Sequence, residues 1–214
     1  MPPIVAGIQN QTSKLNLDLQ ATREALSAFY RKMHRLTEPE LIRSCLSGDQ
    51  RAQRELFDRF AGPMLRVASR YVRNRVDADD VLMMAFARVL ANLNQFMPQG
   101  TGSLQAWVRR IVINEALMWL RRRHNFNLTE TLEENQPIEL TDLSQLPVED
   151  ILRYVNRLPD GYRTVFNLCV VEGYSHAEIA VLLNISESTS RTQLFKAKSL
   201  LQKMLTQEGY HYGT

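Results

Sequence analysis

The sequence has few cysteines, no long apolar run and no signal for secretion. Its 214 residues include only two cysteines, Cys45 and Cys169, which cannot form a disulfide framework or a multi-cysteine zinc site. The apolar runs are far shorter than the roughly 20 residues of a membrane-spanning helix. Residues 1–10 lack the basic start and apolar stretch of a secretory signal. We therefore expect a soluble, cytoplasmic protein without stable membrane insertion.

Positive charge is absent from one part of the chain. The stretch from His124 to Leu152 contains no Lys or Arg, and Pro137 and Pro147 interrupt it. Its seven acids are Glu130, Glu133, Glu134, Glu139, Asp142, Glu149 and Asp150. We interpret residues 125–148 as an acidic linker between two basic domains. A solvated loop whose acids only aid solubility is the alternative.

Alternating β-branched stretches are also scarce, and turn signals separate segments of helical length on both sides of the linker. Thr37 and Glu40 form a capping-box pattern, Gly48-Asp49 and Gly62-Pro63 are predicted breaks, and Asp77 and Asp80 are predicted caps. The later predicted helices are 77–95, 103–123, 148–158 and 162–171. The pattern predicts an all-α protein built from two small helical domains.

The strongest local motif lies near the C-terminus. Ser175 and Glu178 form a second capping-box pattern ahead of a short apolar helix. A turn at Asn184-Ile185-Ser186 leads to a longer helix from Glu187 to about Leu205. A short helix, a tight turn and a longer helix are typical of the helix-turn-helix motif, whose second helix enters the DNA major groove.

A helical wheel divides the longer helix into two faces. Its core stripe consists of Ser190, Leu194, Ala197, Leu201, Met204 and Leu205. Its other face carries Ser188, Thr192, Phe195, Lys196, Ser199 and Lys203, with Arg191 at the edge. A surface Phe among hydroxyls and cations could contact thymine methyls while the cations engage phosphates. An amphipathic bundle helix with a solvated basic face is the alternative.

Two further helices carry unusual polar surfaces. On 103–123, Arg110, Asn114 and Arg121 share a stripe beside Trp107, and the helix ends in Arg121-Arg122-Arg123. Such a stripe could hold a phosphate backbone and an unstacked base, although basic residues also complement the dipole at a helix C-terminus. On 77–95, Met83 and Met84 lie outside the apolar arc, which suits a protein partner or coverage by another segment.

Four collinear segments resemble bacterial RNA polymerase sigma factors of the compact extracytoplasmic-function (ECF) branch, which keeps region 2 and region 4. The resemblance covers roughly residues 41–205. The matching segments are 77–81 with Phe86, similar to the family's Asp-Ala-Glu-Asp-Val helix; 106–114, similar to its Trp-Leu-x-Arg-Ile-Ala-x-Asn segment; 158–166, similar to the opening of region 4; and 172–198, similar to its helix-turn-helix.

The resemblance implies a promoter-specificity subunit without catalytic activity, cofactor or metal. Its partners would be promoter DNA and core RNA polymerase, through the β′ clamp helices and the β flap, with an anti-sigma factor as a further candidate. The implied residues are Ser188, Thr189, Arg191, Thr192, Phe195 and Lys196 for the −35 element; Trp107, Arg110, Asn114, Arg121, Arg122 and Arg123 for the −10 element; and Asp77, Asp79, Asp80, Met83 and Met84 for core polymerase.

The implied domains are region 2 over 37–124, the linker over 125–148, region 4 over 149–207 and a tail over 208–214. Residues 1–36 lie outside the resemblance, and an a/d pattern over 14–36 predicts an amphipathic helix. The segment could also reflect the choice of start site, since Met33 could begin a complete protein. Three positions depart from the family pattern. Met83-Met84-Ala85 stands where the family often has Gln-Glu-Thr, Met118 stands where an Asp is common, and Ser190 stands where Val is usual.

Two other functions compete with a sigma factor. A free-standing helix-turn-helix regulator would explain the C-terminal motif, but not the acidic linker or the Asn114 stripe. A nuclease could use Asp77, Asp79 and Asp80 as metal ligands, but the four histidines are scattered and no Gly-rich phosphate loop occurs. A regulator should bind duplex DNA alone, whereas a sigma factor needs core polymerase.

Overall fold

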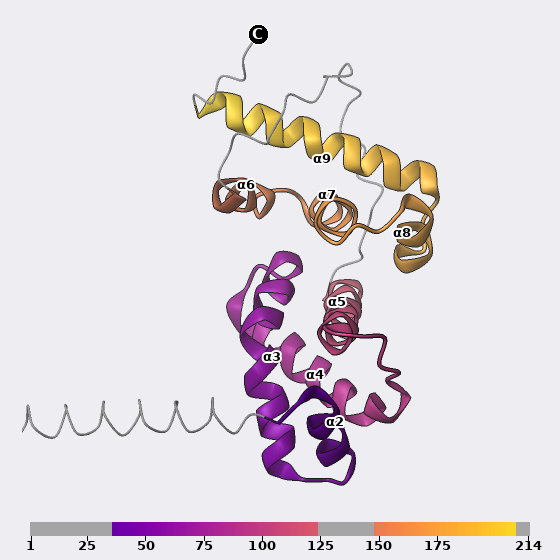
Figure 1. The fold of residues 1–214 in the computed structure, drawn as a ribbon. Coiled ribbons are helices and arrows are strands. Elements are labelled where there is room, and N and C mark those ends of the chain that lie inside the picture. The colour runs from indigo at the N-terminus through magenta and orange to yellow at the C-terminus, as the bar shows by residue number, and fades with distance from the viewer. Residues whose placement is uncertain (1–35, 124–147, 209–214) are drawn as a thin grey trace, which may run out of the picture. The chain divides into compact units, whose positions relative to one another are not determined.

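The computed structural model describes residues 36–123 and 148–208, and within them every regular element is a helix. The elements are α2 (Glu38–Leu46), α3 (Gln50–Tyr71), α4 (Arg75–Asn92), the 3₁₀ helix η1 (Leu93–Gln95), α5 (Ser103–Arg123), α6 (Val148–Val155), α7 (Asp160–Phe166), the π-helix η3 (Asn167–Val171), α8 (His176–Leu183) and α9 (Glu187–Gln207) (Figure 1). The predicted all-α class is confirmed. The predicted helix over 14–36 and the linker over 125–147 lie outside the described residues.

The chain divides into two compact units, one up to Ala52 and one from Gln53 onward. In the first unit, α2 begins at the predicted capping box. The Glu40 carboxylate accepts hydrogen bonds from the Thr37 backbone N (2.8 Å) and hydroxyl (2.7 Å). These bonds lower the pKa of Glu40, with the side-chain bond the larger cause. The predicted break after α2 is also confirmed, because Gly48 has a φ of +84°.

The predicted interruption at Gly62-Pro63 is wrong. Helix α3 is continuous and contains Pro63 in its interior. An interior proline removes one hydrogen bond and costs about 3 kcal/mol. However, Phe60 and Met64 on either side of it are both buried. Burial of two such side chains contributes about 1.5–3 kcal/mol each, so packing of a continuous helix outweighs the local penalty.

The start of α4 also differs from the prediction. Asn74 is the N-cap residue, and its side-chain oxygen accepts a hydrogen bond from the Val76 backbone N (3.0 Å). Asp77 therefore lies in the first turn, and neither it nor Asp80 caps the helix. Asn and Asp are similarly good N-cap residues, so the sequence pattern alone could not distinguish them.

Helices α4 and α5 pack against each other and share an apolar core. Buried side chains of this pair are Ala78, Val81, Leu82, Ala85, Phe86 and Val89 from α4 and Leu104, Val108, Val112, Ala116 and Leu120 from α5. The Phe86 ring also meets the Phe57 ring of α3 edge-on, with centroids 4.8 Å apart. This packing fixes which faces of α4 and α5 remain exposed.

Helix α9 contacts α6, α7 and α8 and is the longest element after the linker (Figure 1). Of its predicted core stripe, Ser190, Leu194, Ala197, Leu201 and Leu205 are buried and Met204 is half-buried. The helix predicted over 148–158 ends at Val155. The one predicted over 162–171 starts at Asp160 and finishes as the π-helix η3.

Candidate nucleic-acid interface

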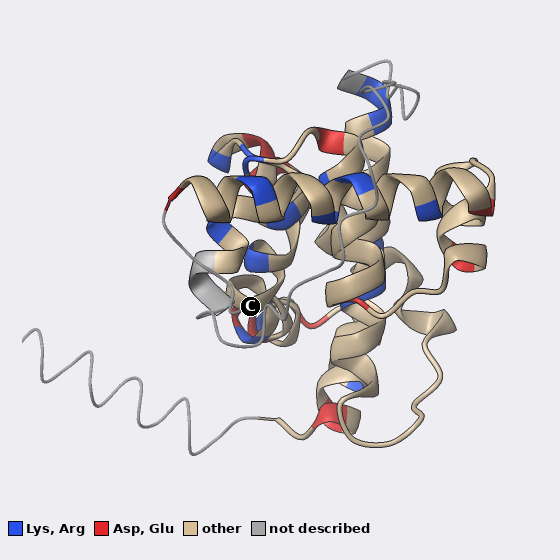
Figure 2. Cartoon of the chain, turned by 90° about the horizontal axis from the view of Figure 1, so that it is seen from above, with Lys and Arg blue, Asp and Glu red and all other residues tan. Residues whose placement is uncertain are grey.

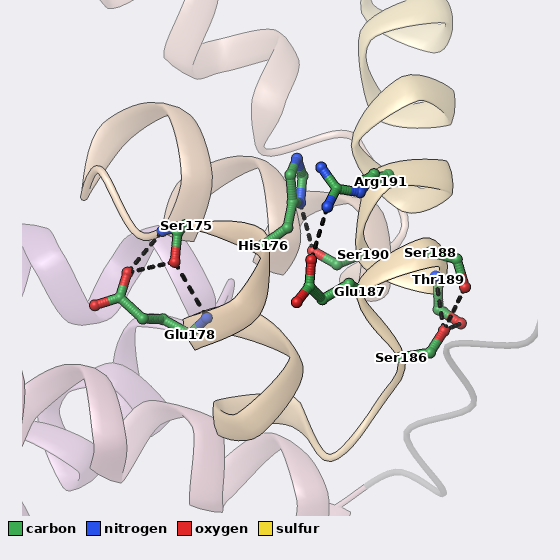
Figure 3. Close-up of polar contacts among 9 residues, drawn as sticks. All are labelled: Ser175, His176, Glu178, Ser186, Glu187, Ser188, Thr189, Ser190 and Arg191. Carbon is green, nitrogen blue, oxygen red and sulfur yellow. Dashed lines mark hydrogen bonds and ion pairs between the residues drawn. The ribbon is translucent and has the colours of Figure 1, made fainter.

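Local capping positions α8 as the first helix of the predicted helix-turn-helix. The Ser175 hydroxyl accepts from the Glu178 backbone N (3.2 Å), and the Glu178 carboxylate accepts from the Ser175 backbone N (2.8 Å) (Figure 3). The backbone hydrogen bond from Ser175 is the larger cause that lowers the pKa of Glu178. At the other end, Asn184 adopts the left-handed conformation with φ 55°, which turns the chain toward α9.

Hydroxyl groups close the first turn of α9. Ser186 is the N-cap residue, and its Oγ accepts from the Thr189 backbone N (3.0 Å). The same Oγ lies 2.7 Å from Ser188 Oγ and 2.8 Å from Thr189 Oγ1 (Figure 3). Ser188 and Thr189, which were predicted to contact DNA, therefore already have hydrogen-bond partners within the turn.

A polar contact joins α8 to the buried side of α9. Ser190 is fully buried, and its Oγ lies 2.8 Å from Nδ1 of His176 at the start of α8. The resemblance places an apolar Val at this position, and sequence reasoning gave His176 no role. The signal available in the sequence was the hydroxyl of Ser190 on the predicted core stripe of α9, because a buried polar group needs a partner.

A stripe of exposed side chains runs along α9 beside its buried side. Glu187, Arg191 and Phe195 occupy successive i, i+4 positions, and their side chains therefore lie on one face. Phe195 is 40% exposed, as predicted for an outward-facing ring. Arg191 Nη2 lies 2.7 Å from Glu187 Oε2. Thr192 is exposed beside them and Lys196 is half-buried. Lys and Arg recur along α9 (Figure 2).

The predicted stripe on α5 is present on the surface of the helix. Arg110, Asn114 and Arg121 are exposed, and Trp107 beside them is half-buried against Phe96, with ring centroids 5.4 Å apart. Spacings of three, four and seven residues place the four predicted side chains on one face. Consecutive helical residues are about 100° apart, so the exposed Arg122 points to another side. The Arg123 side chain lies outside the described residues.

A buried carboxylate that sequence reasoning missed lies next to this stripe. Glu115 of α5 is 2% exposed and forms an ion pair with Arg88 Nε of α4, which is 50% exposed. Because removal of a charge from water costs several kcal/mol unless it is paired, the pair ties the two helices together. The sequence pattern gave no signal that Glu115 is buried, because it is a charged residue that directly follows the exposed Asn114.

Helix α4 exposes an apolar face. Met83 is 59% and Met84 39% exposed, and Val76 shares their side of the helix at 66%. Asp80 is exposed on the same side, while the half-buried Asp79 carboxylate lies 3.1 Å from Arg75 Nε. The predicted methionine surface is therefore accessible, with acids at its margin, and this suits an adaptable protein contact.

Metal-ligating side chains are scattered among the described residues. Among them, no group of three or more His, Cys, Asp or Glu side chains is arranged to hold a metal ion. Neither Cys45 nor Cys169 forms a disulfide bond. No helix within residues 36–123 and 148–208 is long and apolar enough to cross a membrane.

Comparisons with known proteins assign both halves of the chain to one family. Residues 56–126 match the model of sigma-70 region 2, and residues 148–201 match that of sigma-70, region 4. The chain is 28% identical over 172 residues to the ECF RNA polymerase sigma factor SigM of Mycobacterium tuberculosis, with 80% of this chain and 86% of SigM covered. It is 28% identical over 180 residues to the ECF RNA polymerase sigma-E factor of Escherichia coli, with 78% and 93% covered.

Similarity to a third relative covers less of that protein's length. The ECF RNA polymerase sigma factor SigE of Mycolicibacterium smegmatis is 27% identical over 169 residues, which are 74% of this chain and 65% of SigE. Among solved structures, the chain resembles CnrH in complex with the cytosolic domain of CnrY, with 23% identity, a TM-score of 0.45, and 79% of this chain and 97% of that one covered. It also resembles RpoE in complex with the anti-sigma factor NepR from Bartonella quintana, with 18% identity, a TM-score of 0.46, and 72% and 96% covered.

The order of the two matched regions is the one that the sequence motifs predicted. Region 2 contains the α4 and α5 surfaces, and region 4 contains the α8–α9 motif. Members of this family are promoter-specificity subunits that are not themselves enzymes. The matched regions and the named relatives together show that the chain belongs to the sigma-70 family of RNA polymerase sigma factors, in the extracytoplasmic-function branch.

Proposed function

We propose that this sigma factor binds core RNA polymerase with the exposed face of α4, reads −35 duplex with α9 and holds the melted −10 strand on α5. The observation that carries the proposal is that the chain contains both sigma regions and that each region has an exposed face suited to DNA. A free-standing regulator would need only the α8–α9 motif, and it leaves the surfaces of α4 and α5 without a role.

The polymerase contact would rest on Met83 and Met84. Large exposed apolar side chains on a helix are costly in water unless a partner covers them, and methionine adapts to irregular surfaces. Asp77, Asp79 and Asp80 would supply the polar margin. An apolar contact fits this chain better than the polar one implied by the family's Gln-Glu-Thr, because the exposed side chains at the first two of these positions are Met83 and Met84, and Ala85 at the third is buried.

The −35 contact would use Arg191, Thr192, Phe195 and Lys196 on α9, with Ser188 and Thr189 shaping its first turn. Cations on this face would engage phosphates, which supply most of the affinity for duplex DNA. The Phe195 ring is at the surface, where it could contact a thymine methyl in the major groove.

The −10 contact would use the stripe on α5. Asn114 offers both a donor and an acceptor to the edge of an unstacked base. Arg110 and Arg121 on the same face would bind the phosphates on either side, with Arg122 and Arg123 extending the basic end. Trp107 provides an aromatic surface on which a base could stack.

The wider organisation follows from these roles. We place region 2 over 37–124, the acidic linker over 125–148 and region 4 over 149–207. The linker would occupy a positively charged channel of the polymerase, since a polyanion suits a channel built for nucleic acid. The site of action would be the bacterial cytoplasm. An anti-sigma factor, the partner of RpoE in the Bartonella quintana complex, is a candidate partner of this chain.

A defined transcription assay tests the proposal. The chain mixed with bacterial core polymerase should start transcripts from members of a random promoter library, and the chain alone should bind duplex DNA weakly. A variant with Met83→Asp and Met84→Asp should lose assembly with the polymerase. Met97→Asp is the matched control, because Met97 is exposed (79%) outside the proposed surface. Tight operator binding by the chain alone would favour a regulator.

The salt dependence of −35 binding tests the phosphate contacts. Arg191→Ala and Lys196→Ala should each reduce the slope of log K against log salt by about 0.9 for every phosphate that the substituted side chain no longer neutralises. Arg43→Ala, on exposed α2 surface, is the control and should leave the slope unchanged. An unchanged slope in all three variants would remove Arg191 and Lys196 from the phosphate contacts.

A further inference from the structure

One acid stands at the N-terminal end of α9, one turn before Arg191 at the edge of the basic reading face. Glu187 is the first residue of the helix and its only acidic one. Its carboxylate is 2.7 Å from Arg191 Nη2, and the two side chains remain 48% and 62% exposed. The ion pair therefore places a carboxylate and a guanidinium side by side on the surface that would face DNA (Figure 3).

The other polar groups of this first turn are already engaged. The hydroxyls of Ser186, Ser188 and Thr189 contact one another and close the helix N-terminus. Ser190 points inward to His176. The groups of this turn with the most hydrogen-bonding capacity left for an incoming base are the Glu187 carboxylate, with about four acceptor sites, and Arg191, whose guanidinium has five donors.

The helix dipole and the pair with Arg191 both favour a carboxylate in the first turn of α9, but on a helix that would meet DNA the same charge has a cost. DNA phosphates repel it, so its presence weakens binding to any duplex. The major groove offers hydrogen-bond donors only at cytosine N4 and adenine N6, and acidic side chains pair with cytosine N4. Arginine pairs with the O6 and N7 acceptors of guanine. A Glu–Arg pair is therefore suited to read a cytosine and a guanine close together.

We propose that Glu187 reads a cytosine of the −35 element, and that Arg191, oriented by Glu187, reads a guanine one or two base-pair steps away. Four residues of an α-helix rise about 6 Å, and bases along one strand are about 3.4 Å apart, which sets this spacing. Phe195 continues the stripe by another four residues and would contact a thymine methyl beyond the guanine. This inference rests on the proposed reading of −35 duplex by α9.

Selection from a DNA library tests the pair. Full-length chain would be assembled with core polymerase, and bound duplexes randomised at −35 would be sequenced for wild type, Glu187→Gln and Glu187→Ala. Wild type should enrich a cytosine and a guanine within two steps. Glu187→Ala should reduce the preference for that cytosine about 5- to 150-fold, and Glu187→Gln should shift it toward adenine, which the amide recognises. Both variants should bind unselected duplex more tightly.

Glu55→Gln is the matched control. Glu55 and Arg59 form the same i, i+4 ion pair on α3, with Oε1 and Nη2 2.8 Å apart, and this substitution should leave base preference unchanged. The inference is overturned if wild type enriches a −35 sequence and Glu187→Gln enriches the same one. Failure of the wild-type assembly to enrich any −35 sequence would instead refute the proposed function itself, so the two failures are distinguishable.

Discussion

The helix-turn-helix of α8 and α9 and the helix pair α4–α5 are held in place by different interactions. In the former, the side chains of Ser175, Glu178 and Ser186 accept hydrogen bonds from backbone N–H groups at the helix starts, and one partly buried hydrogen bond joins the two helices. In the latter, an extensive apolar core and the Arg88–Glu115 ion pair join segments distant in sequence.

This difference has energetic consequences. Loss of a helix cap or of a single buried hydrogen bond costs about 1 kcal/mol, whereas truncation of a buried Phe, or removal of one partner from a buried ion pair, costs several. The α4–α5 surfaces should therefore be rigidly fixed. The orientation of α9 should depend on several small contributions, each of which substitution can remove separately.

The largest expected effect tests the α4–α5 core. Phe86→Ala should lower the free energy of unfolding by about 4 kcal/mol, because it creates a cavity beside the Phe57 ring. Urea unfolding followed by circular dichroism measures this loss. Met83→Ala on the exposed side of α4 should change stability by less than about 0.5 kcal/mol. Equal losses for both would contradict the assigned faces of α4.

The ion pair between α4 and α5 should give the next largest effect. Arg88→Ala leaves the buried Glu115 carboxylate without its partner and should cost about 3 kcal/mol in the same unfolding experiment. Adding Glu115→Gln should recover part of the loss, because it removes the unpaired charge. Arg75→Ala breaks the exposed pair with Asp79 and should cost no more than about 1 kcal/mol. A similar loss from both arginine variants would argue against a buried pair.

The hydrogen bond between α8 and α9 should have a smaller effect. Ser190→Ala should cost about 1 kcal/mol and should weaken −35 binding by the polymerase assembly. His176→Ala should do the same, whereas His176→Asn should largely restore both properties because its amide can reach the place of Nδ1. A double-mutant cycle should show that the losses from Ser190→Ala and His176→Ala are not additive. Additive losses would show that the two side chains act independently.

The smallest effect concerns the capping carboxylates. The pKa of Glu178 is lowered by hydrogen bonds from Ser175, so its ionised form favours the folded state. This contribution is present above the unfolded-state pKa, about 4.3, and is lost as the pH falls through the lower folded-state pKa. The Glu178→Gln variant should therefore be less stable than wild type at neutral pH. This difference in the free energy of unfolding should shrink below about pH 4, where wild type loses the same contribution. Glu40→Gln should behave likewise on α2, and a pH-independent deficit would contradict the capping role.

Much of the candidate site was predictable because it depends on local chemistry. The capping box at Ser175 and the outward position of Phe195 both follow from residue types at helical spacing. The faces carrying Met83 and Asn114 follow from the same 3.6-residue period. These predictions needed no knowledge of what each helix packs against.

Other features required contacts between distant residues. The continuity of α3 through Pro63 reflects burial on both sides of the proline. The choice of Asn74 over Asp77 as N-cap depends on where α4 begins. The Arg88–Glu115 pair and the His176–Ser190 contact are not encoded in a local pattern, because the two residues of each pair come from different helices.

The sequence by itself determined the helical class and the helix-turn-helix, since periodicity and capping act within a few residues along the chain, and its resemblance to sigma factors gave the order of the two regions. Tertiary structure alone decided which acid is buried and which is exposed. Glu115 and Glu187 are the same residue type, but packing of α4 on α5 encloses the first, while the helix start leaves the second exposed beside Arg191.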